Sequence, residues 1–149
     1  MKKLAVFFLA LSVAFVGCSD DDSETITIDS SQPTGNLTVQ QTGSFVAEGG
    51  TNSSGTVDIG TDTQGVQFLR LGSDFETAVA TGTVAVYLST SVVYTPDPMN
   101  GNPDLRLVGS VNENGEAFFK LEPTAESKFT HVILWCTSVG VQFGNAELN

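Results

Sequence analysis

The sequence HVILWCTSVGVQFGNAEL, residues 131–148, decides the fold that we expect for this chain. It begins with a continuous apolar run rich in β-forming side chains. Further on, Val139, Val141 and Phe143 alternate with small or polar neighbours. Both patterns are typical of a buried strand. We therefore predict a strand through residues 131–143, with Cys136 in its middle, and Gly144 interrupts the pattern before Ala146 and Leu148.

Side chains along this predicted strand point alternately to its two faces. One face holds Val132, Leu134 and Cys136, and the other holds His131, Ile133, Trp135 and Thr137. Because both faces carry apolar side chains, we expect a central position in the sheet. The stretch also contains the one tryptophan and the one histidine of the sequence. Any chemistry is therefore expected here.

The rest of the body consists of short β-rich runs separated by Gly, Asn, Ser, Asp and Pro, which predicts an all-β fold. The predicted strands are residues 44–47, 56–59, 67–71, 84–88 with a weak continuation at 92–94, 105–111 and 116–121. The Asn114-Gly115 dipeptide predicts a type I′ hairpin turn between the last two. About eight strands indicate one antiparallel β-sandwich or barrel-like domain. Phe75 lies in a polar connection between strands, and we expect its side chain to pack into the core beneath that connection.

The first 17 residues have the anatomy of a lipoprotein signal peptide. Lys2 and Lys3 form its charged region, an apolar run follows, and the residues before Cys18 resemble a bacterial lipobox. We therefore expect lipidation at Cys18, and this lipid as the membrane contact, because the apolar run is too short to span a bilayer. An ordinary cleaved signal is the alternative. Residues 36–149 are expected to form the β domain.

Residues 18–35 are expected to be the lipidated cysteine and an acidic, polar tether. A cluster of like charges without apolar residues does not pack into a core. Acidic residues after a lipidated cysteine resemble the surface-export signal of some bacterial lipoproteins, and a plain acidic linker is the alternative. We expect an exported protein that is anchored to the cell envelope, in the outer membrane and displayed at the surface.

Charge restricts the partners of this protein. Without Lys2 and Lys3 the mature chain has four basic side chains against 17 acidic ones, a net charge of −13 compared with −11 for the full sequence. Such a surface repels nucleic acid and anionic lipid. We therefore expect no nucleic acid partner, and a redox or surface protein partner stays open.

Few residues of the body could support catalysis. His131 and Cys136 are five positions apart on one strand, hence on opposite faces and about 16 Å apart, which argues against a shared dyad or metal. Two nitrogen or sulfur ligands are too few for structural zinc, so no metal is predicted. With Cys18 acylated, Cys136 has no disulfide partner. Burial as a small apolar side chain, with a raised pKa, is its simplest interpretation.

The end of the sequence resembles the signature of the DM13 domain, a family proposed to act in electron transfer around a single cysteine. The matching residues are Ile133, Trp135, Cys136, Val141, Phe143, Gly144, Ala146 and Leu148. Weaker matches upstream are Gly43, Phe45, Gly55, Val57, Leu69, Leu71, Phe75, Val86, Tyr87, Leu88, Leu107, Gly109 and Gly115. The resemblance implies that Cys136 is a redox thiol or an axial haem ligand, with Trp135 shaping its pocket.

Three classes of function follow from these observations. The first is an electron-transfer or redox module that uses Cys136 and is not otherwise an enzyme. The second is a surface binding or adhesion module without chemistry, and the third is a structural envelope lipoprotein. A bound chromophore, or reactivity of the Cys136 thiol, separates the first class from the other two.

Overall fold

The structure, a computed structural model, describes residues 31–96 and 101–149. These residues form nine strands and one short 3-10 helix, η1 (Val79–Thr81), so the prediction of an all-β fold is confirmed. The predicted signal peptide, Cys18 and most of the predicted tether lie outside the described residues. In the described ranges there is no helix with the length and hydropathy that a membrane crossing requires.

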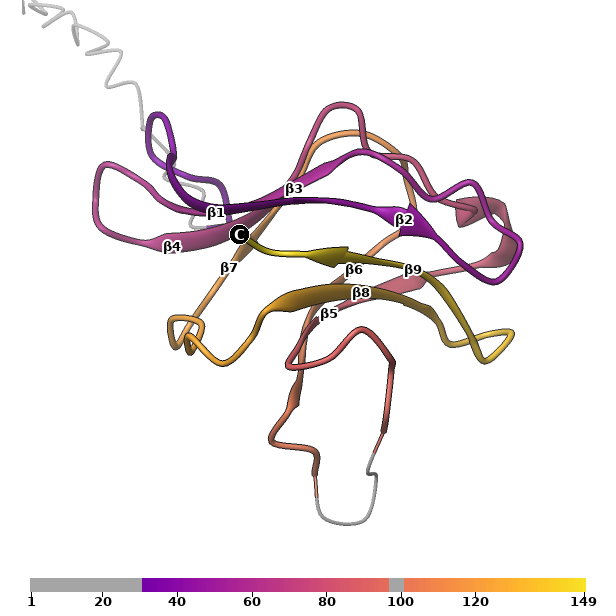
Figure 1. Ribbon diagram of the computed structural model, residues 1–149. Coiled ribbons are helices and arrows are strands. Elements are labelled where there is room, and N and C mark those ends of the chain that lie inside the picture. Colours follow the sequence, from indigo (N-terminus) through magenta and orange to yellow (C-terminus); the bar gives the residue numbers. More distant parts are fainter. Residues whose placement is uncertain (1–30, 97–100) are drawn as a thin grey trace, which may run out of the picture.

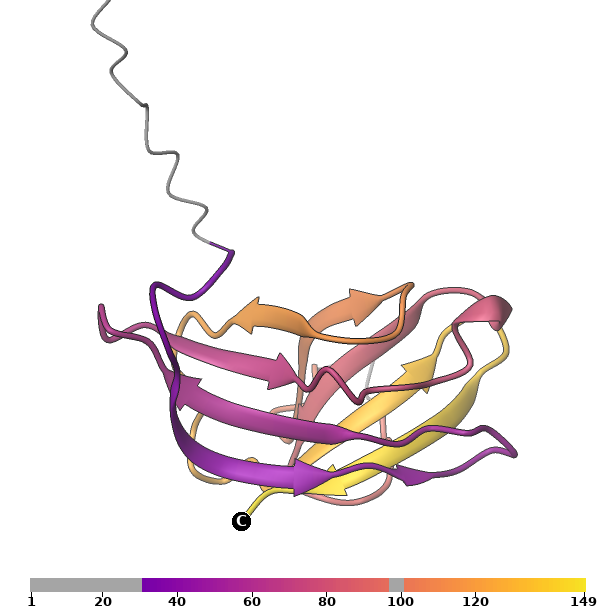
Figure 2. The same ribbon diagram turned by 90° about the horizontal axis from the view of Figure 1, so that it is seen from above.

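The strands form two antiparallel sheets that face each other (Figure 1). The first sheet has the order β1 (Thr38–Ser44), β3 (Thr56–Thr61), β4 (Gln67–Leu71) and β7 (Ala117–Lys120). The second has the order β2 (Val46–Ala47), β9 (Val141–Glu147), β8 (His131–Cys136), β5 (Val84–Ser89) and β6 (Leu105–Val111). Figure 2 shows the first sheet lying across the second. The fold is thus a sandwich, and not a barrel.

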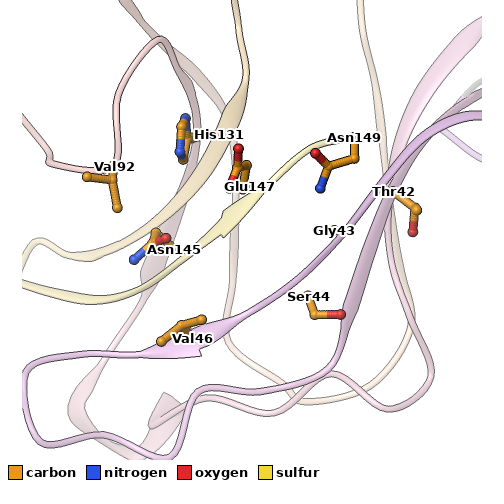
Figure 3. A pocket seen from close by; sticks show the side chains of 9 residues that line it. All are labelled: Thr42, Gly43, Ser44, Val46, Val92, His131, Asn145, Glu147 and Asn149. Carbon is orange, nitrogen blue, oxygen red and sulfur yellow. The ribbon is translucent and has the colours of Figure 1, made fainter.

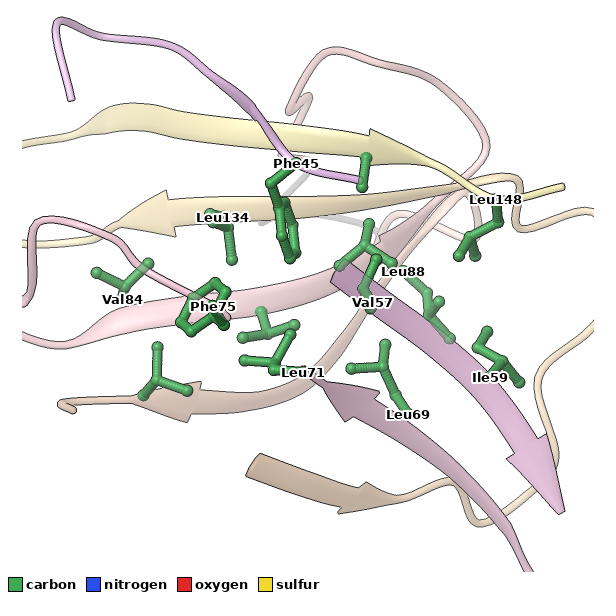
Figure 4. Packing of buried hydrophobic residues seen from close by; sticks show 14 of the residues in the cluster. Phe45, Val57, Ile59, Leu69, Leu71, Phe75, Val84, Leu88, Leu134 and Leu148 are labelled. Atoms are coloured by element: carbon green, nitrogen blue, oxygen red, sulfur yellow. The ribbon is translucent and has the colours of Figure 1, made fainter. Parts of the chain in front are cut away.

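The core fills the space between the two sheets (Figure 4). The labelled side chains in that view are Phe45, Val57, Ile59, Leu69, Leu71, Phe75, Val84, Leu88, Leu134 and Leu148, all of them buried. Phe75 is 1 % exposed and packs edge-on against Phe45, as expected for a core plug. Burial of such side chains is the main term that stabilises a domain of this size.

The strand predicted through residues 131–143 is in fact two strands. β8 is central in its sheet, as expected, but the chain reverses at residues 137–140 and returns as β9 beside it. Gly140 has a φ of +66° and its N–H donates to the Cys136 carbonyl, which closes the turn. Val139 is 54 % exposed at the turn, so apolar alternation misled the prediction. Cys136 therefore lies at the end of a strand, and not in its middle.

The hairpin predicted around Asn114-Gly115 is also wrong. β6 and β7 belong to different sheets, so the connection between them passes from one layer to the other. Gly115 has a φ of +100°, but no residue other than glycine in the described ranges has a positive φ, so the turn is not type I′. The Asn114 side chain instead accepts a hydrogen bond from the Thr77 N–H at 2.9 Å. A contact from another loop thus overrides the local turn signal.

The N-terminal strand was predicted incorrectly as well. Sequence pattern placed one strand at residues 44–47, whereas the chain changes sheets at Phe45, between β1 and β2. β1 is mostly polar and exposed, so it carries little hydrophobic signal. The weak strand predicted at residues 92–94 is absent: this part lies in a connection that follows β5.

Candidate functional site

Cys136 lies on the inner face of β8, in the core between the sheets. Its side chain is 0 % exposed, as are those of Val132 and Leu134 on the same face. This placement confirms the alternation expected from the sequence. His131 lies at the other end of β8, where it pairs with Ser89 and Glu147 of the neighbouring strands. A Cys-His dyad is therefore not formed.

Polar groups approach the sulfur of Cys136 from two directions. The backbone N–H groups of Ser138 and Val139, and the Ser138 hydroxyl, approach from the turn that follows β8. The Thr81 hydroxyl belongs to η1, 55 residues earlier in the chain, and lies 3.7 Å from Sγ, while it donates a hydrogen bond to the Ala78 carbonyl at 2.7 Å. The two N–H groups stand two and three positions after Cys136, as at the start of a helix, where the N-cap side chain accepts the same hydrogen bonds.

These groups shift the pKa of the thiol. Burial acts to raise the pKa of Cys136, but the hydrogen bonds with Val139, Thr81 and Ser138 together outweigh it and lower the pKa from its ordinary value of 9.0. Donors that stabilise a charged form favour deprotonation. The raised pKa expected for a thiol in apolar surroundings is therefore wrong. The sequence could not show the reversal, because Thr81 is remote and the turn was not predicted.

Behind Cys136, on the outer face of the same sheet, three aromatic side chains are in contact. The rings of Trp135 and Tyr94 are stacked, with centroids 3.9 Å apart and an interplanar angle of 16°. Tyr94 meets Tyr87 edge-on at 5.2 Å and 64°. Desolvation, and then the hydrogen bond with Tyr94, raise the pKa of Tyr87 to about 12. We call these three residues the aromatic cluster.

The sequence pointed to Trp135 as a pocket residue, whereas Tyr87 was only a weak family match and Tyr94 only the end of a weak predicted strand. Tyr87 belongs to β5, beside β8, whereas Tyr94 belongs to the connection after β5. The composition offered one clue, because the sequence contains only one tryptophan and two tyrosines. Their association still depends on the path of the connection, which local pattern does not report.

A family model described as Electron transfer DM13 matches residues 44–148. This chain belongs to the DM13 family. No curated protein and no solved structure matches it. The matched range begins at the last residue of β1 and ends just after β9, so the DM13 domain includes Cys136 and the whole aromatic cluster.

The haem ligation that the family resemblance implied for Cys136 does not fit this DM13 domain. An axial ligand must present its sulfur to an open space large enough for a porphyrin. Here Sγ is 0 % exposed, and Thr81 and the turn at residues 137–140 cover it on the side away from the core. The residues present therefore enclose the sulfur and leave no face of it free for iron.

A surface hollow of about 480 Å³ lies at the His131 end of the DM13 domain (Figure 3). Its lining residues are Thr42, Gly43, Ser44, Val46, Val92, His131, Asn145, Glu147 and Asn149. Thr130 Oγ1 and His131 Nδ1 are 2.9 Å apart and share a hydrogen bond. Across the residues that the structure describes, no group of three or more His, Cys, Asp or Glu side chains is arranged to hold a metal ion.

Proposed function

We propose that this DM13 domain is an electron-transfer module in which the Cys136 thiolate is the group that gives up and regains single electrons. The observation that carries the proposal is the set of donors around Sγ, which lower the pKa of a side chain in the core. A charged group in a core is costly unless it is hydrogen-bonded. Three donor groups from residues 138 and 139 around one sulfur are more than packing requires.

Burial favours electron transfer over the other reactions of a thiol. Nucleophilic attack and disulfide exchange need direct access to the sulfur. Cys136 is 0 % exposed, so such access requires an opening of the domain. Electron transfer needs no contact between sulfur and partner. A buried thiol with a lowered pKa, in a family described by electron transfer, supports this role.

Oxidation of the native protein by a one-electron oxidant tests the proposal. In a Cys18→Ser background without oxygen, photogenerated tris(bipyridine)ruthenium(III) should consume the Cys136 thiol while the domain stays folded. Because the thiolate is the donor and its pKa is lowered, the rate should rise with pH and reach half its maximum below pH 9.0.

Two variants complete this test. Cys136→Ser should lose the pH-dependent phase of oxidant consumption, and Ser138→Ala, which removes one donor, should move the half-maximal pH upward. Thiol is counted after unfolding, by titration. Equal oxidant consumption by wild type and Cys136→Ser, with the wild-type thiol intact, would contradict the function.

We also propose that Cys18 is acylated and anchors the domain to the cell envelope, with residues 19–35 as a tether to an outer-membrane or surface location. The leader anatomy supports this proposal. In cells fed a labelled fatty acid, the wild-type protein should carry the label and Cys18→Ala should carry none. Cys136→Ala serves as the control and should be labelled normally. Incorporation of the label into Cys18→Ala would exclude the anchor.

A binding module without chemistry is the second candidate, and the hollow beside His131 favours it. The cross-strand pair His131 and Glu147 offers a donor and a carboxylate there, and Asn145 adds a carboxamide. This role predicts that His131→Ala and Glu147→Ala impair retention of the surface partner, while Cys136→Ser leaves it unchanged. The electron-transfer role predicts the opposite sensitivity.

A further inference from the structure

The aromatic cluster collects all the readily oxidised aromatic side chains of this protein. The sequence has one tryptophan, two tyrosines and ten phenylalanines. The tryptophan and both tyrosines meet in one stack, whereas phenylalanines such as Phe45 and Phe75 fill the core. Indole and phenol lose an electron far more easily than the phenyl ring does. Packing alone does not require tryptophan and tyrosine at these positions, because phenylalanine would fill the space equally well.

The cluster begins one residue away from the buried sulfur. Trp135 and Cys136 are consecutive on β8, so their Cα atoms are about 3.8 Å apart. Their side chains leave the strand on opposite faces, Cys136 into the core and Trp135 to the outer face. The indole is thus the first oxidisable group between the sulfur and the outside of the sheet.

Specific contacts hold Tyr94 against the indole. Gln142 of β9 pairs with Trp135 across the sheet. Its side chain accepts a hydrogen bond from the Tyr94 N–H at 2.8 Å and donates one to the Val92 carbonyl at 2.8 Å. The connection after β5 is thereby fixed over the outer face, on the side away from the first sheet (Figure 1). Trp135, Tyr94 and Tyr87 are each half-buried, so the stack reaches solvent.

We propose that Trp135 and Tyr94 form the path by which single electrons pass between the Cys136 thiolate and a metal centre that meets the solvent-exposed side of the aromatic cluster. This inference rests on the proposed function. The metal centre accepts one electron. The thiolate loses one electron and becomes a thiyl radical, and the metal centre is reduced by one electron. No bond of the chain breaks, and the thiol proton has already gone to solvent when the thiolate forms. The reverse transfer restores the thiolate.

Flash oxidation of the full chain, again with photogenerated tris(bipyridine)ruthenium(III), tests the path. Because every tryptophan and tyrosine of the sequence belongs to the cluster, any such radical seen by transient absorption must arise there. In the wild type we expect a short-lived aromatic radical whose decay coincides with loss of the Cys136 thiol. In Cys136→Ser the aromatic radical should form as before and persist.

Two substitutions separate the path from the fold. Trp135→Phe keeps a ring in place but removes the indole, and Tyr94→Phe keeps the stack but removes the phenol; both should lose the fast phase of thiol oxidation. Phe118→Leu, a change of a half-buried aromatic residue in the other sheet, should retain it. Far-ultraviolet circular dichroism verifies that each variant is folded, and Tyr94→Phe provides the test if Trp135→Phe does not fold.

The outcomes distinguish this inference from the proposed function. If Trp135→Phe and Tyr94→Phe both oxidise the thiol as fast as wild type, the path is wrong while the redox role of Cys136 stands. If the wild-type thiol survives and the radical lifetime is the same in Cys136→Ser, the proposed function fails and the path fails with it.

Discussion

Alkylation of Cys136 by iodoacetamide is expected to be at least about a thousandfold slower in the folded protein than in the unfolded chain. The side chain is 0 % exposed, so the reagent must wait for the domain to open. In small domains the native state is favoured over the unfolded state by a factor of about 10³ or more. If only unfolded molecules expose the sulfur, the labelling rate falls by the same factor. The lowered pKa does not offset this protection, because it changes the charge of the sulfur and not its access.

Pseudo-first-order labelling rates in a Cys18→Ser background, measured with and without urea, provide the comparison. A control is Gly140→Ala, which places a side chain at a φ of +66° and should loosen the turn and speed the labelling. Native labelling within about tenfold of the unfolded rate would show that residues 137–140 open locally. The sulfur would then be open to direct chemistry, and an electron path through the sheet would be unnecessary.

Replacing Phe75 with alanine is expected to cost about 3–5 kcal/mol of unfolding free energy, the range for large aromatic residues deleted from a core. The ring is 1 % exposed and lies 5.4 Å from that of Phe45, between the sheets. Its backbone also joins neighbouring loops, since the Phe75 carbonyl accepts a hydrogen bond from the Gly115 N–H at 2.9 Å. The neighbours are thus held in place and cannot readily close the cavity.

Urea denaturation of wild type and variant measures the change as a shift in midpoint at constant slope. Val139→Ala is the matched control, because Val139 is 54 % exposed and a surface change of this kind should stay within about 0.5 kcal/mol. Phe75→Ala should also accelerate Cys136 alkylation, since it raises the population of the open state. A cost below about 1 kcal/mol would mean that the connection after β4 is not part of the core.

Much of the fold could be predicted because it depends on local pattern. The runs at β4 and β6 are continuous in apolar or β-forming residues and were located with their correct bounds. β1 carried no such pattern, because an edge strand with one face in solvent can be polar. The connection between β6 and β7 failed for another reason: its local turn signal was real, but loop contacts from Phe75 and Thr77 decided its shape.

The candidate site, like the fold, could be predicted from the sequence only in part. The position of Cys136 on an apolar face, opposite His131 and Trp135, follows from a period of two along one strand. The pKa of its thiol does not, since Thr81 contacts the sulfur from 55 residues away and the amides of Ser138 and Val139 require a turn that the alternating valines concealed. Tyr94 likewise reaches Trp135 only because Gln142 holds the connection over the sheet.

By itself, then, the sequence determined the all-β class, the central strand with its two faces, the buried cysteine and the DM13 relationship, since each depends on residue types and on spacing along one segment. Only the tertiary structure decided which strands share a sheet, that the sulfur meets hydrogen-bond donors, and that every tryptophan and tyrosine gathers behind it. These features join residues far apart in the chain. Their geometry is set by how the two sheets and their connections pack, and no local pattern encodes it.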